Sequence, residues 1–451
     1  MCAWKMNPFT GELDYYEASN ALHNRIGIPG EQDFGVGICP EASLPGGMTP
    51  MDGCYIPGND SYGNYQFSDG SVMCWVPKFF YRIAHASNPT YAVHGVNSVD
   101  IKGADTFADE AVANAAGYAL HRAFWDGGVE KLGFFVDKYK CSKRALGTGY
   151  VASSIANALP LSSAVAHNPF SELTGGVDAY YSALDLAHRR DGVNGAVNAS
   201  SIFFCSSQFI RSALAMLSLA HGQYSSNDTW CAWYHATYNY PKGCNNNALH
   251  DCDDATVVYT TDGYSNCGKT GSGSPFAKTT HNGQACGVAD LNGLVYEISI
   301  GVTCNGTNFY AAKKATAMKA FTNGAAAATD HWGATGIAAM MEALTVPVIT
   351  GNDGWIFFGN AANQVLGEDV SGNSWVLTGL GVPDSTDGMS AGGTNLFGVD
   401  GFYRYIANQL CLIAGANWDN GDLAGVWCLH WAFARVYSDD YVGFRAACYP
   451  V

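Results

Sequence analysis

The 451-residue chain is poor in charge, and basic residues are especially few. Charged residues make up 14% of it, where about 25% is typical of globular proteins. The 23 Lys and Arg against 39 Asp and Glu leave a net charge of −16, and no basic cluster interrupts the acidic excess. A surface of this sign is repelled by phosphate backbones, so nucleic-acid binding is excluded as an expected function.

Long apolar runs are also missing. No stretch approaches the roughly 20 apolar residues that a membrane-spanning helix needs. The opening residues, MCAWKMNPFTGELDYYE, contain no apolar run of signal-peptide length. We therefore expect no membrane insertion and no signal peptide. The 48% hydrophobic content with so little charge predicts a folded protein with a large core.

The motifs of the common metal sites and hydrolases are absent too. The 15 cysteines form no CxxC pair, and neither HExxH nor GxSxG occurs. These absences argue against a zinc site. Because no export signal is seen, we expect most of the cysteines to be reduced, buried and inert. Asp251, Asp253 and Asp254 lie close together but lack EF-hand spacing. A solvated acidic loop is expected there, with bound calcium kept as the alternative.

Glycine and tyrosine are abundant instead. The 53 glycines and 25 tyrosines predict many tight turns and long ordered loops, as in the segment 222–287. Strands are predicted over 72–84 and 133–142, the first at a sheet edge because it contains Pro77. Helices are predicted over 177–190, 207–221 and 336–344. The fold class is therefore α+β with much irregular structure.

The strongest pattern lies in the tail, residues 412–451, LIAGANWDNGDLAGVWCLHWAFARVYSDDYVGFRAACYPV. This tail resembles the variable C-terminal region of proteins diversified by diversity-generating retroelements, the family of the major tropism determinant. The order and spacing of a set of fixed residues carry the resemblance. They are Gly415, Trp418, Asn420-Gly421, Ala424-Gly425, Arg435 and Gly443-Phe444-Arg445.

A second resemblance covers more of the chain. The segments 133–142 (GFFVDKYKCS), 283–299 (GQACGVADLNGLVYEIS) and 442–445 (VGFR) are similar to the formylglycine-generating-enzyme branch of the C-type lectin fold. The two resemblances agree, because retroelement variable proteins use this fold. They imply a C-type lectin domain with long loops and insertions over residues 72–451. Residues 1–71 match neither pattern and are expected to form an N-terminal attachment or cap segment.

The residue types at the fixed positions are typical of residues that maintain a fold. Glycines at 421, 425 and 443 can adopt turn conformations closed to other residues, and Trp418 and Phe444 can anchor a core. Arg435 or Arg445, if buried, would need carboxylate or carbonyl partners. We call Gly415, Trp418, Gly421, Gly425, Arg435, Gly443, Phe444 and Arg445 the frame.

The residues between the frame positions mix aromatic and short polar side chains, which suit a binding surface. Without the frame around them they would be ordinary strand and loop surface. With it, we expect a ligand-binding face, called here the variable face. It comprises Asp419, Asp422, Leu423, His430, Ala432, Phe433, Val436, Tyr437, Asp439, Asp440 and Tyr441.

The resemblance implies a ligand- or receptor-binding protein, not an enzyme, with no cofactor and no catalytic residues. Its target would be a host or cell-surface protein or a glycan. Its place would be the tip of a viral tail fibre or a cell surface, and its assembly a homotrimer, since fibre-tip proteins are often trimers. In this family, diversification randomises template adenines, so an Asn codon never becomes Trp. Trp418, Trp427 and Trp431 are therefore predicted to belong to the scaffold.

Three alternatives stay open. Catalysis like that of a formylglycine-generating enzyme uses a pair of cysteines in this region, whereas residues 415–445 contain only Cys428. Calcium-dependent sugar binding uses a Trp-Asn-Asp order that residues 417–420, Asn-Trp-Asp-Asn, do not reproduce. A structural virion protein without a receptor would not present the variable face on one open surface.

Overall fold

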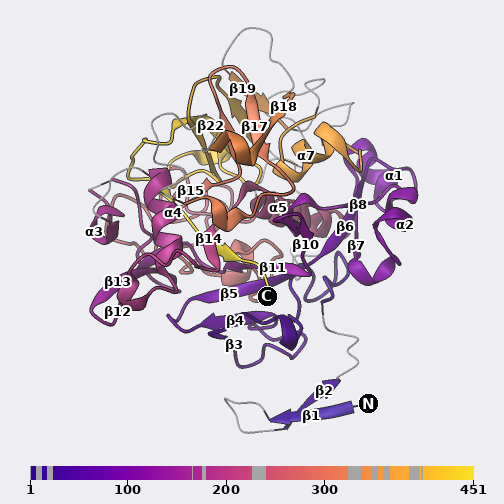
Figure 1. Cartoon of the computed structure of the whole chain (residues 1–451), viewed down its shortest axis with the longest axis horizontal. Coiled ribbons are helices and arrows are strands. Elements are labelled where there is room, and N and C mark those ends of the chain that lie inside the picture. The colour runs from indigo at the N-terminus through magenta and orange to yellow at the C-terminus, as the bar shows by residue number, and fades with distance from the viewer. Residues whose placement is uncertain are drawn as a thin grey trace.

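The computed structural model describes residues 24–164, 166–174, 179–225, 240–322, 337–346, 354–358, 366–384, 397 and 400–451, with the backbone of 2–6 and 13–17. Two six-stranded sheets and a buried helix organise this part of the chain. Figure 1 shows one sheet in the lower half of the molecule and the other in the upper half, with helix α5 near the centre. The structure is mixed α+β, as the sequence predicts.

The lower sheet is antiparallel throughout. Its order is β14 (Phe203–Cys205), β24 (Ala446–Cys448), β11 (Gly133–Asp137), β5 (Val72–Pro77), β4 (Asn64–Phe67) and β3 (Met48–Pro50). The strand predicted over 72–84 is two strands, with β5 inside this sheet and β6 in another. The expected edge position is wrong. Pro77 needs no edge because it is the last residue of β5, where the ladder ends.

The upper sheet combines antiparallel and parallel pairs. Its order is β19 (Gly354–Phe357), β20 (Gly401–Arg404), β22 (Leu429–Ala434), β21 (Leu410–Ala414), β15 (Tyr296–Ser299) and β23 (Val442–Gly443). The pairs β20–β22 and β15–β23 are parallel. Residues from three separate parts of the chain, 296–299, 354–357 and 401–443, therefore meet in one sheet.

Smaller sheets surround these two. Three strands form each of the sheets β16 (Val302–Cys304), β17 (Phe309–Ala312), β18 (Met341–Leu344) and β7 (Val99–Gly103), β6 (Phe79–Ile83), β8 (Ala119–Leu120). The two-stranded pairs are β1 (Cys2–Met6) with β2 (Leu13–Glu17), β9 (Trp125–Asp126) with β10 (Val129–Glu130), and β12 (Cys141–Leu146) with β13 (Gly149–Ser154).

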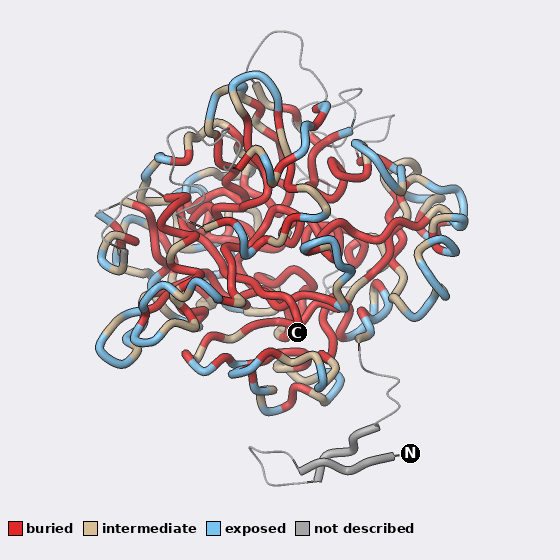
Figure 2. Tube along the Cα trace, in the orientation of Figure 1, coloured by how far each residue is buried: buried red, intermediate tan, exposed pale blue. Residues whose placement is uncertain are grey.

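The described helices are α1 (Tyr91–His94), α2 (Glu110–Ala115), α3 (Ser171–Thr174), α4 (Ala179–Arg189), α5 (Gln208–Tyr224) and α7 (Gly372–Leu380). Helix α5 begins at Ser207 as predicted, because the Ser207 hydroxyl accepts a hydrogen bond from the Ile210 N–H. It is buried on every side from Gln208 to Gly222, and Figure 2 shows this buried centre with exposed loops around it. The helix predicted over 336–344 is wrong, since a short 3-10 turn there leads directly into strand β18.

Residues 24–71 are packed into the same body as the rest of the described chain. Strands β3 and β4 extend the lower sheet, and Phe34, Ile38 and Tyr62 are buried in the main core. The boundary expected at residue 72 therefore falls between the paired strands β4 and β5.

The tail connects the two large sheets. It supplies β22 and β23 to the upper sheet and β24 to the lower one, and Figure 1 marks the C-terminus close to β5 and β11. Arg445 lies at the crossover between β23 and β24. Both ends of the predicted variable region are thus fixed by strand pairing.

The thirteen cysteines in the described residues are all free, and all but Cys252 are buried, which confirms the expected burial for that part of the chain. None of the described helices has the length and apolar character needed to cross a bilayer.

Candidate ligand-binding face

The frame is almost entirely buried. Among its eight residues only Gly421 is partly exposed. Gly415 has φ +86°, and a Cβ there would lie 2.4 Å from the Leu291 carbonyl oxygen. A Cβ on Gly425 would lie 1.7 Å from an Asp400 oxygen. Larger residues at these two positions would displace the surrounding backbone or the buried carboxyl, so both glycines are needed for close packing.

Trp418 and Phe444 are core anchors, as expected. Trp418 packs edge-on against the rings of His167 and Tyr264, at centroid distances of 5.7 and 6.1 Å. Phe444 contacts Phe170 in an edge-to-face pair at 5.5 Å. The two aromatic residues therefore attach the tail to loops that lie far away in the sequence.

Arg445 lies in a buried ionic cluster. Its Nε donates to Glu297 Oε1 at 2.8 Å, and its Nη atoms donate to the carbonyl oxygens of Asp137, Lys138 and Ala289. Lys140 and Arg211 also bond the Glu297 carboxylate. This arrangement supplies the carboxylate and carbonyl partners that a buried arginine requires.

The charge on Glu297 is set by this cluster. Burial by itself would raise the pKa of Glu297, but Arg445 first, followed by Lys140 and Arg211, outweighs it and holds the pKa at about 2. The carboxylate is therefore ionised throughout the neutral range and joins β15 to the crossover of the tail.

Arg435 differs from this expectation. It is completely buried, yet none of its three guanidinium nitrogens has a hydrogen-bond partner among the described residues. Its Cζ lies 5.9 Å from the centre of the Tyr180 ring. Burial lowers the pKa of Arg435, with Tyr180, Tyr181 and Cys411 opposing the effect.

The variable face follows the opposite pattern from the frame. None of its ten residues with a described side chain is buried, and the side chain of Asp422 lies outside the described residues. Asp419 and Val436 are exposed, and the other eight are half-buried. The three neighbouring tryptophans, Trp418, Trp427 and Trp431, are all buried, as their predicted scaffold role requires.

Aromatic rings form a continuous strip across the upper sheet. His430 stacks on Tyr403 at 4.6 Å and contacts Phe433 at 4.8 Å, and Phe433 contacts Tyr437 at 4.2 Å. The Tyr437 and Tyr441 hydroxyls then share a 2.7 Å hydrogen bond. Burial lowers the pKa of His430 to about 4, so this ring is neutral at pH 7.

Two residues of this strip were not predicted from the tail. Trp355 in β19 is the register partner of Tyr403 in β20, and Tyr403 is the register partner of His430 in β22. The three half-buried side chains form one row across neighbouring strands. The pairing of β19, β20 and β22 brings these three residues together, and no sequence motif predicts that pairing.

Carboxylates border the aromatic strip. Asp439 accepts a hydrogen bond from the Tyr437 hydroxyl, and Asp440 accepts one from Tyr264. Burial, with the neighbouring Asp439, raises the pKa of Asp440. Within the described part of the chain, neither residue, nor Asp419, forms an ion pair with Lys or Arg. The variable face is thus aromatic with a negatively charged rim.

Cys428 and residues 417–420 are the groups on which the enzymatic and the calcium-dependent alternatives depend. Cys428 is buried, and burial raises the pKa of its thiol, which leaves little nucleophilic thiolate. In the 417–420 segment, Asn417 is buried and Asn420 accepts a hydrogen bond from the Asn417 N–H. Only Asp419 there is exposed, so this segment does not gather oxygen ligands for calcium.

The acidic loop at 251–254 is not the solvated loop that we expected. Asp251 is buried and accepts hydrogen bonds from the N–H groups of Gly243, Asp253 and Asp254. Lys242 lies 3.6 Å from its carboxylate. The residue closes a turn, and a nearby cation offsets its charge.

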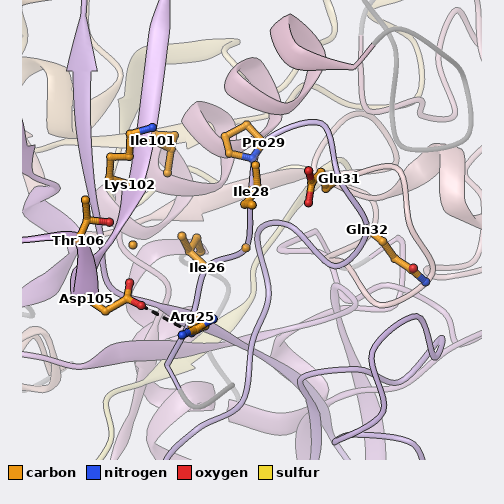
Figure 3. A pocket seen from close by; sticks show the side chains of 12 residues that line it. Arg25, Ile26, Ile28, Pro29, Glu31, Gln32, Ile101, Lys102, Asp105 and Thr106 are labelled. Carbon is orange, nitrogen blue, oxygen red and sulfur yellow. Dashed lines mark ion pairs between the residues drawn. The ribbon is translucent and has the colours of Figure 1, made fainter. Parts of the chain in front are cut away.

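A separate pocket of about 360 Å³ lies beside β7, near the start of the described body. Figure 3 shows Arg25 and Asp105 facing each other there, and their side chains are 51% and 59% exposed with a 3.6 Å separation. This exposed ion pair is not a set of desolvated titratable groups of the kind that catalytic pockets use.

The comparisons with known proteins leave the family open. No known family model matches the chain, and no curated protein is significantly similar to it.

Proposed function

We propose that this chain is a ligand-binding protein with a C-type lectin fold whose variable face is diversified by a retroelement. The observation that carries the proposal is the separation between frame and face. Seven of the eight frame residues are buried, and none of the ten described face residues is. Such a division lets the binding surface change while the scaffold is retained, because substitutions outside the core usually have small effects on stability.

The binding target is a host or cell-surface protein or a glycan. The aromatic strip supplies rigid contact area, and the carboxylates at its rim supply hydrogen-bond acceptors. Both kinds of target use such groups. The protein is expected on a viral tail fibre or a cell surface, as a homotrimer, and without a catalytic role.

Sequencing the DNA around the gene tests the diversification directly. We expect a near-copy of the tail-coding segment close by, next to a reverse-transcriptase gene. The copy should encode Asn at most variable-face positions and Trp at 418, 427 and 431. Differences at template bases other than adenine, or the absence of a second copy, would contradict the proposal.

Binding through the face is tested with the double variant Asp419→Arg, Val436→Arg, called here the face variant. Both residues are exposed, so the fold should be retained while two cations enter the acidic rim. Labelled wild-type protein should bind susceptible cells saturably, and the face variant should not. Val93→Arg is the matched control, since Val93 is 79% exposed in α1, far from β22 in Figure 1. A face variant that binds as well as this control would place the binding site outside the variable face, and wild-type protein that binds no cells would favour a structural role.

A further inference from the structure

Beneath the variable face, three side chains with metal-binding groups meet. The His167 Nε2, a carboxylate oxygen of Asp262 and the Cys267 Sγ all lie within 4.8 Å of one another. The His167 Nε2 is 2.5 Å from Asp262 Oδ2, and both side chains are almost fully buried, with exposed fractions of 3% and 0%. Cys267 is fully buried as well. Imidazole, carboxylate and thiolate are the ligands that zinc prefers in proteins.

A short loop holds two of these groups in place. The Asp262 N–H donates to the Cys267 carbonyl, and the Cys267 N–H donates to the Tyr264 carbonyl. Asp262 Oδ1 accepts a hydrogen bond from the Tyr264 N–H at 2.8 Å, which directs Oδ2 towards His167. Two ligand residues five positions apart are thus oriented by the loop's own backbone, a spacing unlike the CxxC pairs sought in the sequence.

The other nitrogen of His167 points to a metal-binding tautomer. Its Nδ1 lies 2.7 Å from the Asp440 carbonyl oxygen, which can only accept a hydrogen bond, so Nδ1 carries a proton. The Nε2 then faces the Asp262 carboxylate, which is also an acceptor when ionised. The contact between Nε2 and Oδ2 is then stabilised either by a second proton on the imidazole or by a cation that both atoms bind, and metal titration distinguishes the two. Donation from the remote nitrogen to a carbonyl is the usual support of a metal-bound histidine.

The surroundings exclude water and keep the thiol protonated when no cation is present. The Tyr264 ring stacks on His167 at 4.3 Å, and Trp418 covers its edge. Burial, with the neighbouring Asp262, raises the pKa of the Cys267 thiol well above its ordinary value. A divalent ion that binds here releases that proton to solvent and takes the thiolate as a ligand.

We propose that His167, Asp262 and Cys267 form a binding site for a divalent ion of the zinc class. Ligand atoms about 2.0–2.3 Å from a tetrahedral ion lie further apart than 2.5 Å, so binding separates the His167–Asp262 pair by about 1 Å. The site would stabilise the loop of Asp439, Asp440 and Tyr441, because His167 bonds the Asp440 carbonyl oxygen. This inference stands on the buried cluster and does not depend on the proposed function.

Cobalt(II) titration of the EDTA-treated full chain tests the site. We expect one equivalent to produce a thiolate-to-cobalt charge-transfer band and the visible bands of a tetrahedral ion, both abolished by one equivalent of zinc. Zinc should also raise the melting temperature of the wild-type protein.

Cys267→Ser should lose the charge-transfer band. Cys244→Ser, which changes another buried cysteine of the same small cluster, should keep it. Circular dichroism checks that each variant is folded. If Cys267→Ser does not fold, His167→Gln replaces it, with loss of the visible tetrahedral bands as the readout. The absence of both bands in folded wild-type protein, or a charge-transfer band unchanged in Cys267→Ser, would overturn the proposal. A His167 imidazole that stays doubly protonated after zinc is added, as seen by nuclear magnetic resonance, would also overturn the proposal.

Discussion

Replacing Arg445 with Met tests whether the crossover of the tail is held by charge. The substitution keeps an unbranched apolar stem of similar length and removes the guanidinium. Four hydrogen bonds disappear, one to Glu297 Oε1 and three to the carbonyl oxygens of Asp137, Lys138 and Ala289. All four acceptors belong to a region that water does not reach.

The expected loss of unfolding free energy is about 3–5 kcal/mol, the usual range for removing one partner of a buried ion pair. Glu297 would keep Lys140 and Arg211, so its carboxylate is not left isolated. The Lys138 carbonyl oxygen would keep the Ala289 N–H as a donor. The carbonyl oxygens of Asp137 and Ala289 would lose the guanidinium, and a buried acceptor left without a donor costs about 1–3 kcal/mol. Against a typical total stability of about 5–15 kcal/mol, this is a large fraction.

Urea unfolding followed by tryptophan fluorescence measures the loss. Arg25→Met is the matched control, because Arg25 forms an ion pair whose side chains are more than half exposed, and exposed pairs contribute about 0–1 kcal/mol. Arg445→Lys should fall between the two, since it keeps the charge without the forked geometry. If Arg445→Met is no less stable than Arg25→Met, the cluster does not hold the crossover and the reasoning fails.

Two further predictions concern the residues around the face. Burial raises the pKa of Asp400 to about 8, above its unfolded value, so wild-type stability falls as pH rises towards 8. The unfolding free energy of Asp400→Asn should therefore rise by about 1 kcal/mol relative to wild type between pH 7 and 8, as measured by urea unfolding at each pH. Burial lowers the pKa of Lys140 to about 8, but Lys140 is present in both proteins, so its contribution cancels in the difference. A constant difference across that range would show that Asp400 is ionised in the folded protein. The face variant, Asp419→Arg with Val436→Arg, should change the melting temperature no more than Val93→Arg, because all three side chains are exposed. A large loss in the face variant alone would place those residues in the core.

Several local elements were predictable from the sequence because local signals determine them. Ser207 caps the start of α5, and the continuous apolar run of residues 134–136 marks the β11 region. The segment 336–344 was predicted as a helix with an apolar face that ends ahead of Pro347. In the structure Met341 and Leu344 are buried residues of strand β18, which pairs with β17. Tertiary pairing therefore overrides the local helix preference.

The composition of the binding surface was only partly predictable. The spacing of frame residues identified which tail positions would be buried, since it reflects packing within one continuous segment. Trp355 and Tyr403 could not be found this way, because only the register of β19 and β20 places them beside His430. The pairing of His167 with Asp262 could not be predicted from the sequence either, because the two residues lie 95 positions apart.

The row formed by Trp355, Tyr403 and His430 has a consequence for any repertoire built on this scaffold. Two of its three rings are encoded outside the tail, so exchanging tail residues leaves them unchanged. Every variant of the proposed repertoire then inherits the rings of Trp355 and Tyr403, which lie at 71° to each other, and changes only the side chains beside them. The proposed binding sites would therefore share one constant aromatic contact area. The constant part of the proposed binding surface is therefore supplied by β19 and β20.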